Sequence, residues 1–228
     1  MNAAKVVVRW ARVDCIDPSD EHGWLSLSDR SRLAGMRQDL DRRHFVGARL
    51  LLRGSIVDLL DCDPARIELH QRCPRCAGPH GRPLVTVGGR AGPHVSIAHA
   101  GGLALIAIST RPVGIDLEPV VGTIGPDADT KRTWVRTEAV LKATGYGLDL
   151  DPSLISVSAP SAPPRLDSWG GPGRRPQLRM EDLDIDGFVA AVARFGRRRV
   201  RSDLARSQVP VGGAASSSAE GVAGATTG

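Results

Sequence analysis

The sequence is poor in aromatic residues and in lysine. Phe, Trp and Tyr make up only 4% of the 228 residues, so the core must be built from Leu, Val, Ile and Ala. Three of the 30 basic residues are lysines, and the rest are arginines. Arginine suits phosphate groups because its planar guanidinium donates two parallel hydrogen bonds. With a formal net charge of +5, a basic cleft would favour a multiply phosphorylated ligand or an acidic protein partner.

The sequence also lacks long apolar runs and has few cysteines. The apolar stretch Val6–Val8 is followed directly by Arg9 and is too short for a secretory signal. No apolar run approaches the length that crosses a membrane. Four cysteines in a chain of this size do not resemble a disulfide scaffold. We therefore expect a cytoplasmic protein that does not bind membranes.

Apolar spacing and turn residues predict a mixture of helices and strands. We expect helices at about 30–42, 42–60 and 133–144, the last ending at Gly145. We expect strands at 5–14, 67–70, 103–109, 113–118, 154–158, 177–180 and 187–194. The strands at 103–109 and 113–118 are expected to pair antiparallel across a tight turn. Glycine and proline predict a loop at 120–133.

Acidic residues in two of these segments suggest one site. Asp116 and Glu118 are two apart in the expected strand 113–118, so both carboxylates project from one face. Glu138 and Lys142 are four apart in the expected helix and share a face as well. Three carboxylates without thiolates suit Mg²⁺, a hard cation that also binds phosphate oxygens. An acidic strand end beside an amphipathic helix is the alternative without function.

The two segments together resemble a known family. Gly114-Ile115-Asp116 with Glu118, followed by Trp134, Glu138, Ala139 and Lys142, resembles the 4′-phosphopantetheinyl transferases of the Sfp type. Members of that family move the phosphopantetheine arm of coenzyme A onto a serine of a carrier protein. The resemblance covers roughly residues 5–195. It implies that Asp116, Glu118 and Glu138 hold Mg²⁺ and that Glu138 and Lys142 are catalytic.

Three further stretches resemble elements that bind coenzyme A in this family. A run of arginines at 42–53 resembles its basic first motif, and we expect Arg43 and Arg53 to contact phosphates. Gly81-Arg82-Pro83 resembles an element of which Arg82 and Pro83 would line the cofactor site. His99 takes the place of a phosphate-binding histidine. A solvated arginine face and a core histidine are the alternatives.

The resemblance also predicts the fold and the domain organisation. It implies an α+β fold of two pseudo-symmetric lobes, each a small antiparallel sheet packed with helices. We expect an N-terminal lobe at 1–111 on the coenzyme A side and a C-terminal lobe at 112–200 with the acids and the helix. Residues 201–228 are expected to form a disordered tail, because their composition is rich in Gly, Ala, Ser and Thr. A two-lobed protein of this kind can act as a monomer.

The chain departs from the family pattern at several positions. Only 22 residues separate Asp116 from Glu138, fewer than in the family, and the helix that usually carries a further glutamate is not expected. Ser96, Ala98 and Thr137 replace an asparagine, a serine and a lysine. These departures leave the general base open, with Glu138 or a metal-held water as candidates. They also favour a second hypothesis, a degenerate homologue that binds coenzyme A or a carrier protein without catalysis.

A third hypothesis concerns the cysteines. Cys73, Cys76 and His80 could supply three ligands to a structural zinc, with His70 or Cys62 as a fourth. A reduced dithiol in a loop is the alternative, because a second ligand pair is missing. A zinc-dependent nucleic-acid binder would need that pair and aromatic residues among the arginines. We therefore expect no nucleic-acid partner.

Overall fold

The computed structural model describes residues 5–19, 24–71, 76, 78, 81–120, 125–197 and 200–209. These residues form three α-helices and twelve strands in four small sheets, which confirms the predicted α+β class with small antiparallel sheets. The helices are α1 (Leu27–Ala34), α2 (Asp39–Leu60) and α3 (Pro126–Thr144). Within this described part, no helix is both long and apolar enough to cross a membrane.

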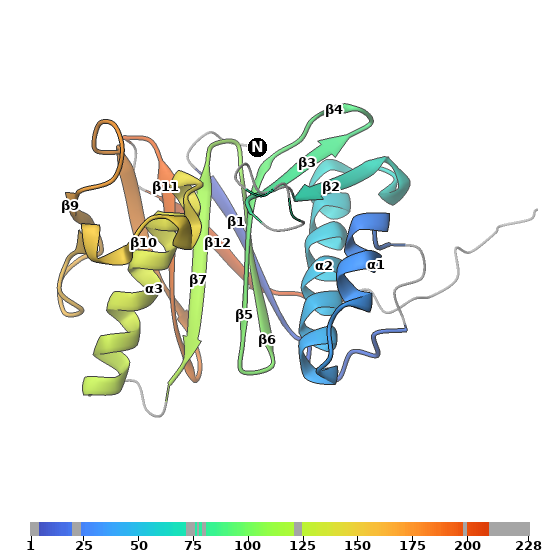
Figure 1. Ribbon diagram of the computed structural model, residues 1–228, viewed down its shortest axis with the longest axis horizontal. Coiled ribbons are helices and arrows are strands. Elements are labelled where there is room, and N and C mark those ends of the chain that lie inside the picture. The colour runs from blue at the N-terminus through green and yellow to red at the C-terminus, as the bar shows by residue number, and fades with distance from the viewer. Residues whose placement is uncertain are drawn as a thin grey trace, which may run out of the picture.

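The two larger sheets lie between the two long helices (Figure 1). The first has the order β12 (Arg201–Arg206), β1 (Lys5–Arg12), β6 (Leu103–Ser109) and β5 (His94–Ala100). The second has the order β10 (Leu178–Ile185), β11 (Phe188–Phe195) and β7 (Val113–Pro119). Helix α2 covers the first sheet and α3 covers the second, so the layers follow the order helix, sheet, sheet, helix.

The smaller elements lie at the edges of these layers. One small sheet contains β2 (Ile67–Gln71), β3 (Pro83–Val87) and β4 (Arg90–Ala91), and the other contains β8 (Ile155–Val157) and β9 (Leu166–Trp169). Short 3₁₀ turns lie at η1 (Pro64–Arg66), η2 (Gly147–Asp149) and η3 (Pro152–Leu154). The turn η2 matters most for the site, because it follows the end of α3.

Continuous apolar runs explain why the central strands are buried on both faces. In β6, Leu103, Leu105 and Ala107 face the second sheet, whereas Ala104, Ile106 and Ile108 face α2. The same division holds for β1, where Val6 and Val8 point toward the second sheet and Val7 toward α2. A strand that is covered on both sides needs apolar residues at every position rather than at alternate ones.

Helix α3 lies unusually close to β7 because β7 contains a glycine at the contact. A Cβ added to Gly114 would lie 2.0 Å from the carbonyl oxygen of Ala139 and 2.4 Å from the amide nitrogen of Ala143. Only the absence of a side chain permits this approach. The helix ends as expected at Gly145, whose left-handed backbone (φ 85°) lets its amide bond Leu141 and Lys142 carbonyls.

The predicted hairpin of 103–109 and 113–118 was wrong. Strand β6 pairs with β1 and β5, whereas β7 pairs antiparallel with β11, about 75 residues later in the chain. The acids therefore do not lie at the tip of a central hairpin. The turn between β6 and β7 instead leads the chain from the first sheet to the second. There β6 is covered by α2 and the second sheet, and β7 by the first sheet and α3.

Three predicted boundaries also differ from the structure. The loop predicted at 120–133 contains the start of α3: Pro126 takes the first helical turn, and Asp127 and Asp129 there favour the helix dipole. The first helix spans 27–34 rather than 30–42, since Ser26 caps it by accepting a hydrogen bond from Asp29. Residues 201–206 are the strand β12 and not part of a tail.

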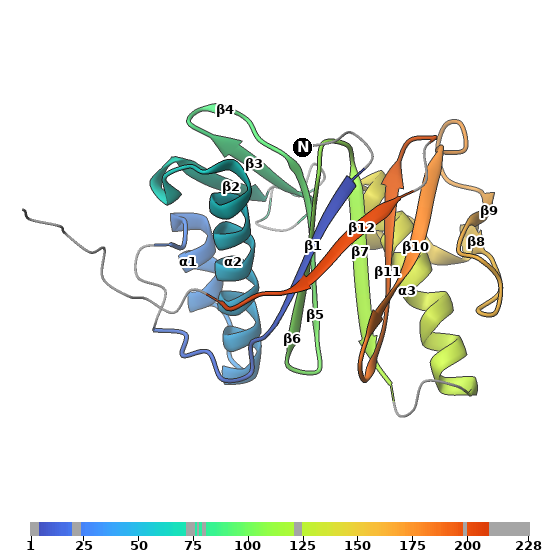
Figure 2. The ribbon, with the colours of Figure 1, turned by 180° about the vertical axis from the view of Figure 1, so that it is seen from behind.

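Strand β12 extends the first sheet by pairing parallel with β1, and Figure 2 shows the two strands side by side. Ion pairs reinforce the backbone ladder. Asp203 lies 3.0 Å from Lys5 and 3.5 Å from Arg9, while the guanidinium of Arg206 lies 5.3 Å from the centre of the Trp10 ring. A polar edge strand of this kind carries little apolar signal, which explains why the composition alone suggested a tail.

Candidate functional site

A cavity of about 770 Å³ lies between the α2 side and the α3 side of the molecule. One wall comes from α1, α2 and the β2–β3 sheet, and the opposite wall comes from α3 and η2. This volume falls within the range of cavities that bind small molecules and cofactors. The cavity brings together Glu138, Lys142, His99, Arg82 and Pro83, five of the residues that the sequence had suggested.

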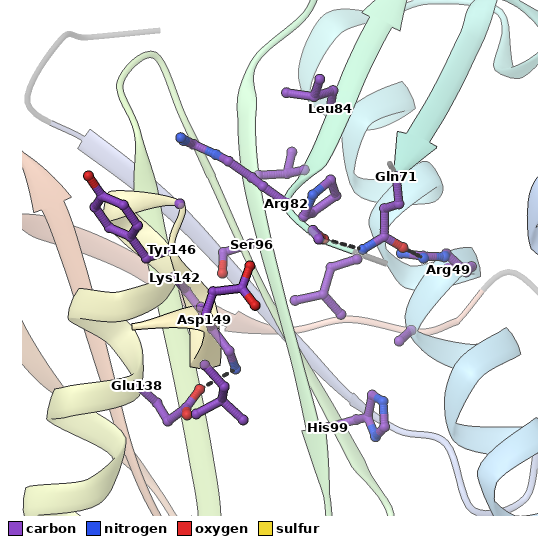
Figure 3. Close-up of a pocket in the computed structure, with 18 of the residues that line it drawn as sticks. Arg49, Gln71, Arg82, Leu84, Ser96, His99, Glu138, Lys142, Tyr146 and Asp149 are labelled. Carbon is purple, nitrogen blue, oxygen red and sulfur yellow. Dashed lines mark hydrogen bonds and ion pairs between the residues drawn. The ribbon is translucent and has the colours of Figure 1, made fainter. Parts of the chain in front are cut away.

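An acid and amine cluster lies at the α3 end of the cavity (Figure 3). Lys142 Nζ is 3.9 Å from Glu138 Oε2 one helical turn earlier. It is also 2.6 Å from Asp116 Oδ1 on β7. Asp116 and Glu138 are each 7% exposed. The predicted spacing therefore brings the helix pair to the strand acid, because α3 packs directly on β7.

Burial is the largest cause that raises the pKa of each of the three predicted acids, Asp116, Glu118 and Glu138. Burial raises the pKa of Asp116, and the nearby Lys142 opposes that effect. Burial and the charge of Asp116 raise the pKa of Glu118. Burial, with smaller contributions from Asp116 and Glu118, raises the pKa of Glu138. Glu138 Oε1 is buried without a hydrogen-bond partner. A positive charge brought to this cluster would relieve both the repulsion and the desolvation.

The carboxylate oxygens of Asp116, Glu118 and Glu138 are the type of ligand that a hard cation such as Mg²⁺ prefers. One of these oxygens, Glu138 Oε1, lacks a hydrogen-bond partner. Among the residues that the structure describes, however, no three His, Cys, Asp or Glu side chains are grouped closely enough to hold a metal ion. The amine of Lys142 takes the position between Asp116 and Glu138 instead. A cation bound by all three acids would have to displace that amine from Asp116.

The arginines that line the cavity are not Arg43 and Arg53, the two that the sequence analysis expected to contact phosphates. Arg43 bonds Asp39 at 2.8 Å and the carbonyl oxygen of Ile16, while the buried Arg53 donates to the carbonyl oxygen of Ile67. Neither of them lines the cavity. The side chains that do are Arg32, Arg49 and Arg82.

The sequence contains a signal that could have identified Arg49 as a residue lining the cavity. It follows Phe45 by four residues, so the two share one face of α2, and both line the cavity. Its guanidinium bonds Asp29 at 2.9 Å, and both side chains are buried. Arg32 carries no comparable signal, because it belongs to a helix whose bounds were misplaced. Gln71 was missed as well, since an amide at a strand end is common.

His99 lies at the cavity beside a second histidine. The ring centres of His44 and His99 are 5.8 Å apart. Although His99 is exposed as a whole residue, burial of its ring by the surrounding protein, followed by the neighbouring His44, Lys142 and Arg32, lowers its pKa to about 4. Asp41 opposes this effect. At neutral pH His99 is therefore uncharged, and an anion in the cavity would favour its protonation.

The serine at the family's asparagine position has a structural role. Ser96 is buried, and its hydroxyl oxygen accepts a hydrogen bond of 3.1 Å from the amide of Ile115. This bond joins β5 to β7 across the boundary between the two large sheets. It holds β5, which carries His99 near its end, against β7, which carries Asp116.

The zinc hypothesis lies mostly outside the described residues. Cys73 and His80 are not among them, whereas Cys76 is exposed. His70 is also exposed and lies 3.2 Å from Glu68, and Cys62 packs against the apolar core. A structural zinc at Cys73, Cys76 and His80 therefore stays a prediction.

The chain was also compared with known proteins. No model of a known protein family matches it, and no curated protein matches it significantly.

Proposed function

We propose that the chain is a 4′-phosphopantetheinyl transferase of the Sfp type, acting on an apo acyl or peptidyl carrier protein with coenzyme A as donor. One observation carries the proposal. A single cavity has three arginines on one wall and the pair of Glu138 and Lys142, with Asp116 behind it, on the other. The arginines and Lys142 would suit the phosphates of coenzyme A, and the nearby acids would suit a cation that offsets their charge.

In this proposal Asp116, Glu118 and Glu138 would hold Mg²⁺, which when bound would offset the negative charge of the pyrophosphate. Lys142 and Arg82 would bind phosphate oxygens and stabilise the charge that builds up as the phosphate ester breaks. An amine displaced from Asp116 by the metal would be free to bind phosphate oxygens in the cavity that Lys142 lines. The three arginines would orient the nucleotide end of the donor.

The reaction would be a displacement at phosphorus. The serine hydroxyl of the carrier protein attacks the β-phosphorus, the new Ser O–P bond forms, and the bond to the oxygen of 3′,5′-ADP breaks. The serine proton would pass to Glu138, whose raised pKa and unpartnered Oε1 suit a general base. 3′,5′-ADP leaves with the electron pair of the broken bond.

Exposed apolar side chains near the cavity suit a protein partner. Leu84 on β3 is 59% exposed and Leu148 on η2 is 67% exposed, and both line the cavity. Tyr146, 38% exposed, lies beside Leu148 in the chain. A carrier protein that delivers its serine to the cavity would cover these residues. Their burial would offset part of the cost of association.

The test is transfer to an apo carrier protein with Mg²⁺ and coenzyme A, followed by intact-protein mass. The wild type should add one phosphopantetheine group, and Asp116→Asn and Glu138→Gln should abolish the addition. Asp184→Asn removes an exposed acid on β10 and is the matched control, which should leave transfer unchanged. Full transfer by either site variant would remove the basis of the acid assignment.

A second candidate is a homologue that binds coenzyme A or a carrier protein without catalysis. The short contact of 2.6 Å between Lys142 and Asp116 favours it, since the amine occupies an acid that the metal would need. In that case coenzyme A should bind with equal affinity with and without Mg²⁺, and no carrier protein should gain mass. Calorimetric titration of coenzyme A in the presence of Mg²⁺ or of EDTA distinguishes the two candidates.

A further inference from the structure

The side-chain amide of Gln71, at the end of β2, contacts three separate elements beside the cavity (Figure 3). Its Oε1 accepts a hydrogen bond of 3.2 Å from Arg32 Nη1 on α1 and another from Arg49 Nη2 on α2. Its Nε2 donates a hydrogen bond of 2.8 Å to the carbonyl oxygen of Gly81. Gly81 directly precedes Arg82, so one amide holds two arginine side chains and the backbone next to a third.

The same two arginines share a second contact. The guanidinium carbons of Arg32 and Arg49 lie 5.1 and 4.9 Å from the centre of the Phe45 ring. An aromatic face attracts a guanidinium group to a place over the ring, but it does not fix the direction in which the N–H groups point. The shared acceptor at Gln71 supplies the direction that the ring does not. Phe45 and Gln71 together bring two like charges to one wall of the cavity.

The choice of an amide at this position has an electrostatic consequence. The charge of Arg49 is already balanced by Asp29 at 2.9 Å. A glutamate at position 71 would accept the same two hydrogen bonds, but it would add a negative charge beside both guanidinium groups. A glutamine accepts the bonds without adding negative charge, and its NH₂ group also donates to Gly81, which a carboxylate cannot do. The wall is therefore one charge more positive with glutamine at position 71 than it would be with glutamate.

We propose that Gln71 is a positioning residue, which orients Arg32 and Arg49 directly and Arg82 through Gly81, so that the cavity wall binds a phosphate-bearing ligand. That this ligand is coenzyme A rests on the proposed function. The anion site itself does not, because it depends only on the arginines and their neutral acceptor. Gln71 acts through its neighbours and is not assigned a contact with the reacting atoms.

The first test uses inorganic pyrophosphate and coenzyme A as probes in calorimetric titrations at low salt. Gln71→Leu removes the acceptor, and Gln71→Glu keeps the acceptor but adds charge. We expect each change to weaken binding of both probes on the order of tenfold. Gln177→Leu is the matched control, because Gln177 accepts from Arg197 at 3.1 Å on an exposed surface. It should bind both probes like the wild type.

Stability separates positioning from a merely structural role. Gln71→Glu strengthens the two hydrogen bonds from the arginines but loses the one to Gly81, so it should unfold near the temperature of the wild type, yet bind the probes poorly. If Gln71→Glu binds pyrophosphate like the wild type, or if the wild type binds neither probe, the inference is wrong. Should Gln71→Leu not fold, Gln71→Glu alone decides the outcome.

The transfer assay adds a readout that distinguishes this inference from the proposed function. In Gln71→Glu we expect the KM for coenzyme A to rise on the order of tenfold with kcat within about twofold, since Lys142 and Glu138 are unchanged. Probe binding that depends on Gln71 in a protein without transfer activity would retain the anion site and reject the proposed function. Transfer activity with an unchanged KM for coenzyme A in Gln71→Glu would support the proposed function and reject the role of Gln71.

Discussion

Lys142 Nζ on α3 lies 2.6 Å from Asp116 Oδ1 on β7, and this ion pair joins the helix to the strand at the end of the cavity. The Asp116 side chain is 10% exposed and that of Lys142 is 28% exposed. Burial raises the pKa of Asp116 and would favour its neutral form, while the amine favours the charged form. The Lys142 amine therefore favours a charged Asp116 carboxylate at a position where burial alone would favour the neutral acid.

Removing the amine should destabilise the fold. We expect Lys142→Met to lower the free energy of unfolding by about 1–3 kcal/mol at neutral pH, because Asp116 is left buried without its partner. The loss should shrink as pH falls, since protonation of Asp116 removes the unpaired charge. Urea unfolding at several pH values measures both effects. Lys131→Met, which breaks a more exposed pair with Asp127, should cost less than about 1 kcal/mol.

The close approach of α3 to β7 predicts a severe effect at Gly114. The methyl group of Gly114→Ala would overlap backbone atoms of Ala139 and Ala143, which cannot move without shifting the helix. We expect a loss of about 3 kcal/mol or more in unfolding free energy, together with displacement of Lys142. Gly35→Ala is the control, because its Cβ would meet nothing closer than 3.5 Å. Equal stability of the two variants would contradict the packing described here.

The fall in the free energy of unfolding at acidic pH should depend on His99. Its pKa is lowered to about 4 in the folded protein, against 6.5 for the free side chain. Between these values the unfolded chain binds the proton and the folded protein does not, so stability falls as pH drops from about 6.5 to about 4. His99→Gln should lose less stability than the wild type over this window in urea titrations. His70→Gln, at an exposed histidine, should follow the wild type.

Arg136 should be the most sensitive arginine outside the cavity. Its side chain is 1% exposed, bonds both oxygens of Asp182 at 3.0 and 2.6 Å, and donates to backbone carbonyls between residues 158 and 162. Arg136→Met removes all of these hydrogen bonds and the closest cation of Asp182, and should cost about 3–5 kcal/mol. Arg132→Met removes a partner of the same acid from the surface and should cost less than about 1 kcal/mol. Thermal melts of the two variants measure the difference.

Short-range sequence patterns predicted the positions of several helices and strands, but they did not predict which strands pair. Gly145 gave the end of α3, and the apolar run at 187–194 gave β11 within about one residue. The pairing of β6 with β7 failed because a tight turn favours a hairpin whenever two apolar strands are adjacent in sequence. Here both strands are covered on two faces, and β7 pairs with a strand near the other end of the chain. No local signal carries that information.

The same distinction applies to the site. The spacing of Glu138 and Lys142 on one helix is local, and the structure places them together and against Asp116. The choice among the arginines of α2 depended on which face of that helix meets the cavity, and Arg43 and Arg53 point elsewhere. Gln71 becomes visible only once β2 is placed beside α1 and α2. Its role lies in contacts between elements that are about 20 to 40 residues apart.

The pairing of β12 with β1 has a consequence for synthesis on the ribosome. Strand β1 is among the first described segments to emerge, but its parallel neighbour is the last of the described strands to be made. Until residue 206 has left the exit tunnel, one edge of β1 offers unpaired amides and carbonyls to other nascent chains. We therefore expect ribosome-bound chains that stop before β12 to aggregate more readily than released full-length chains.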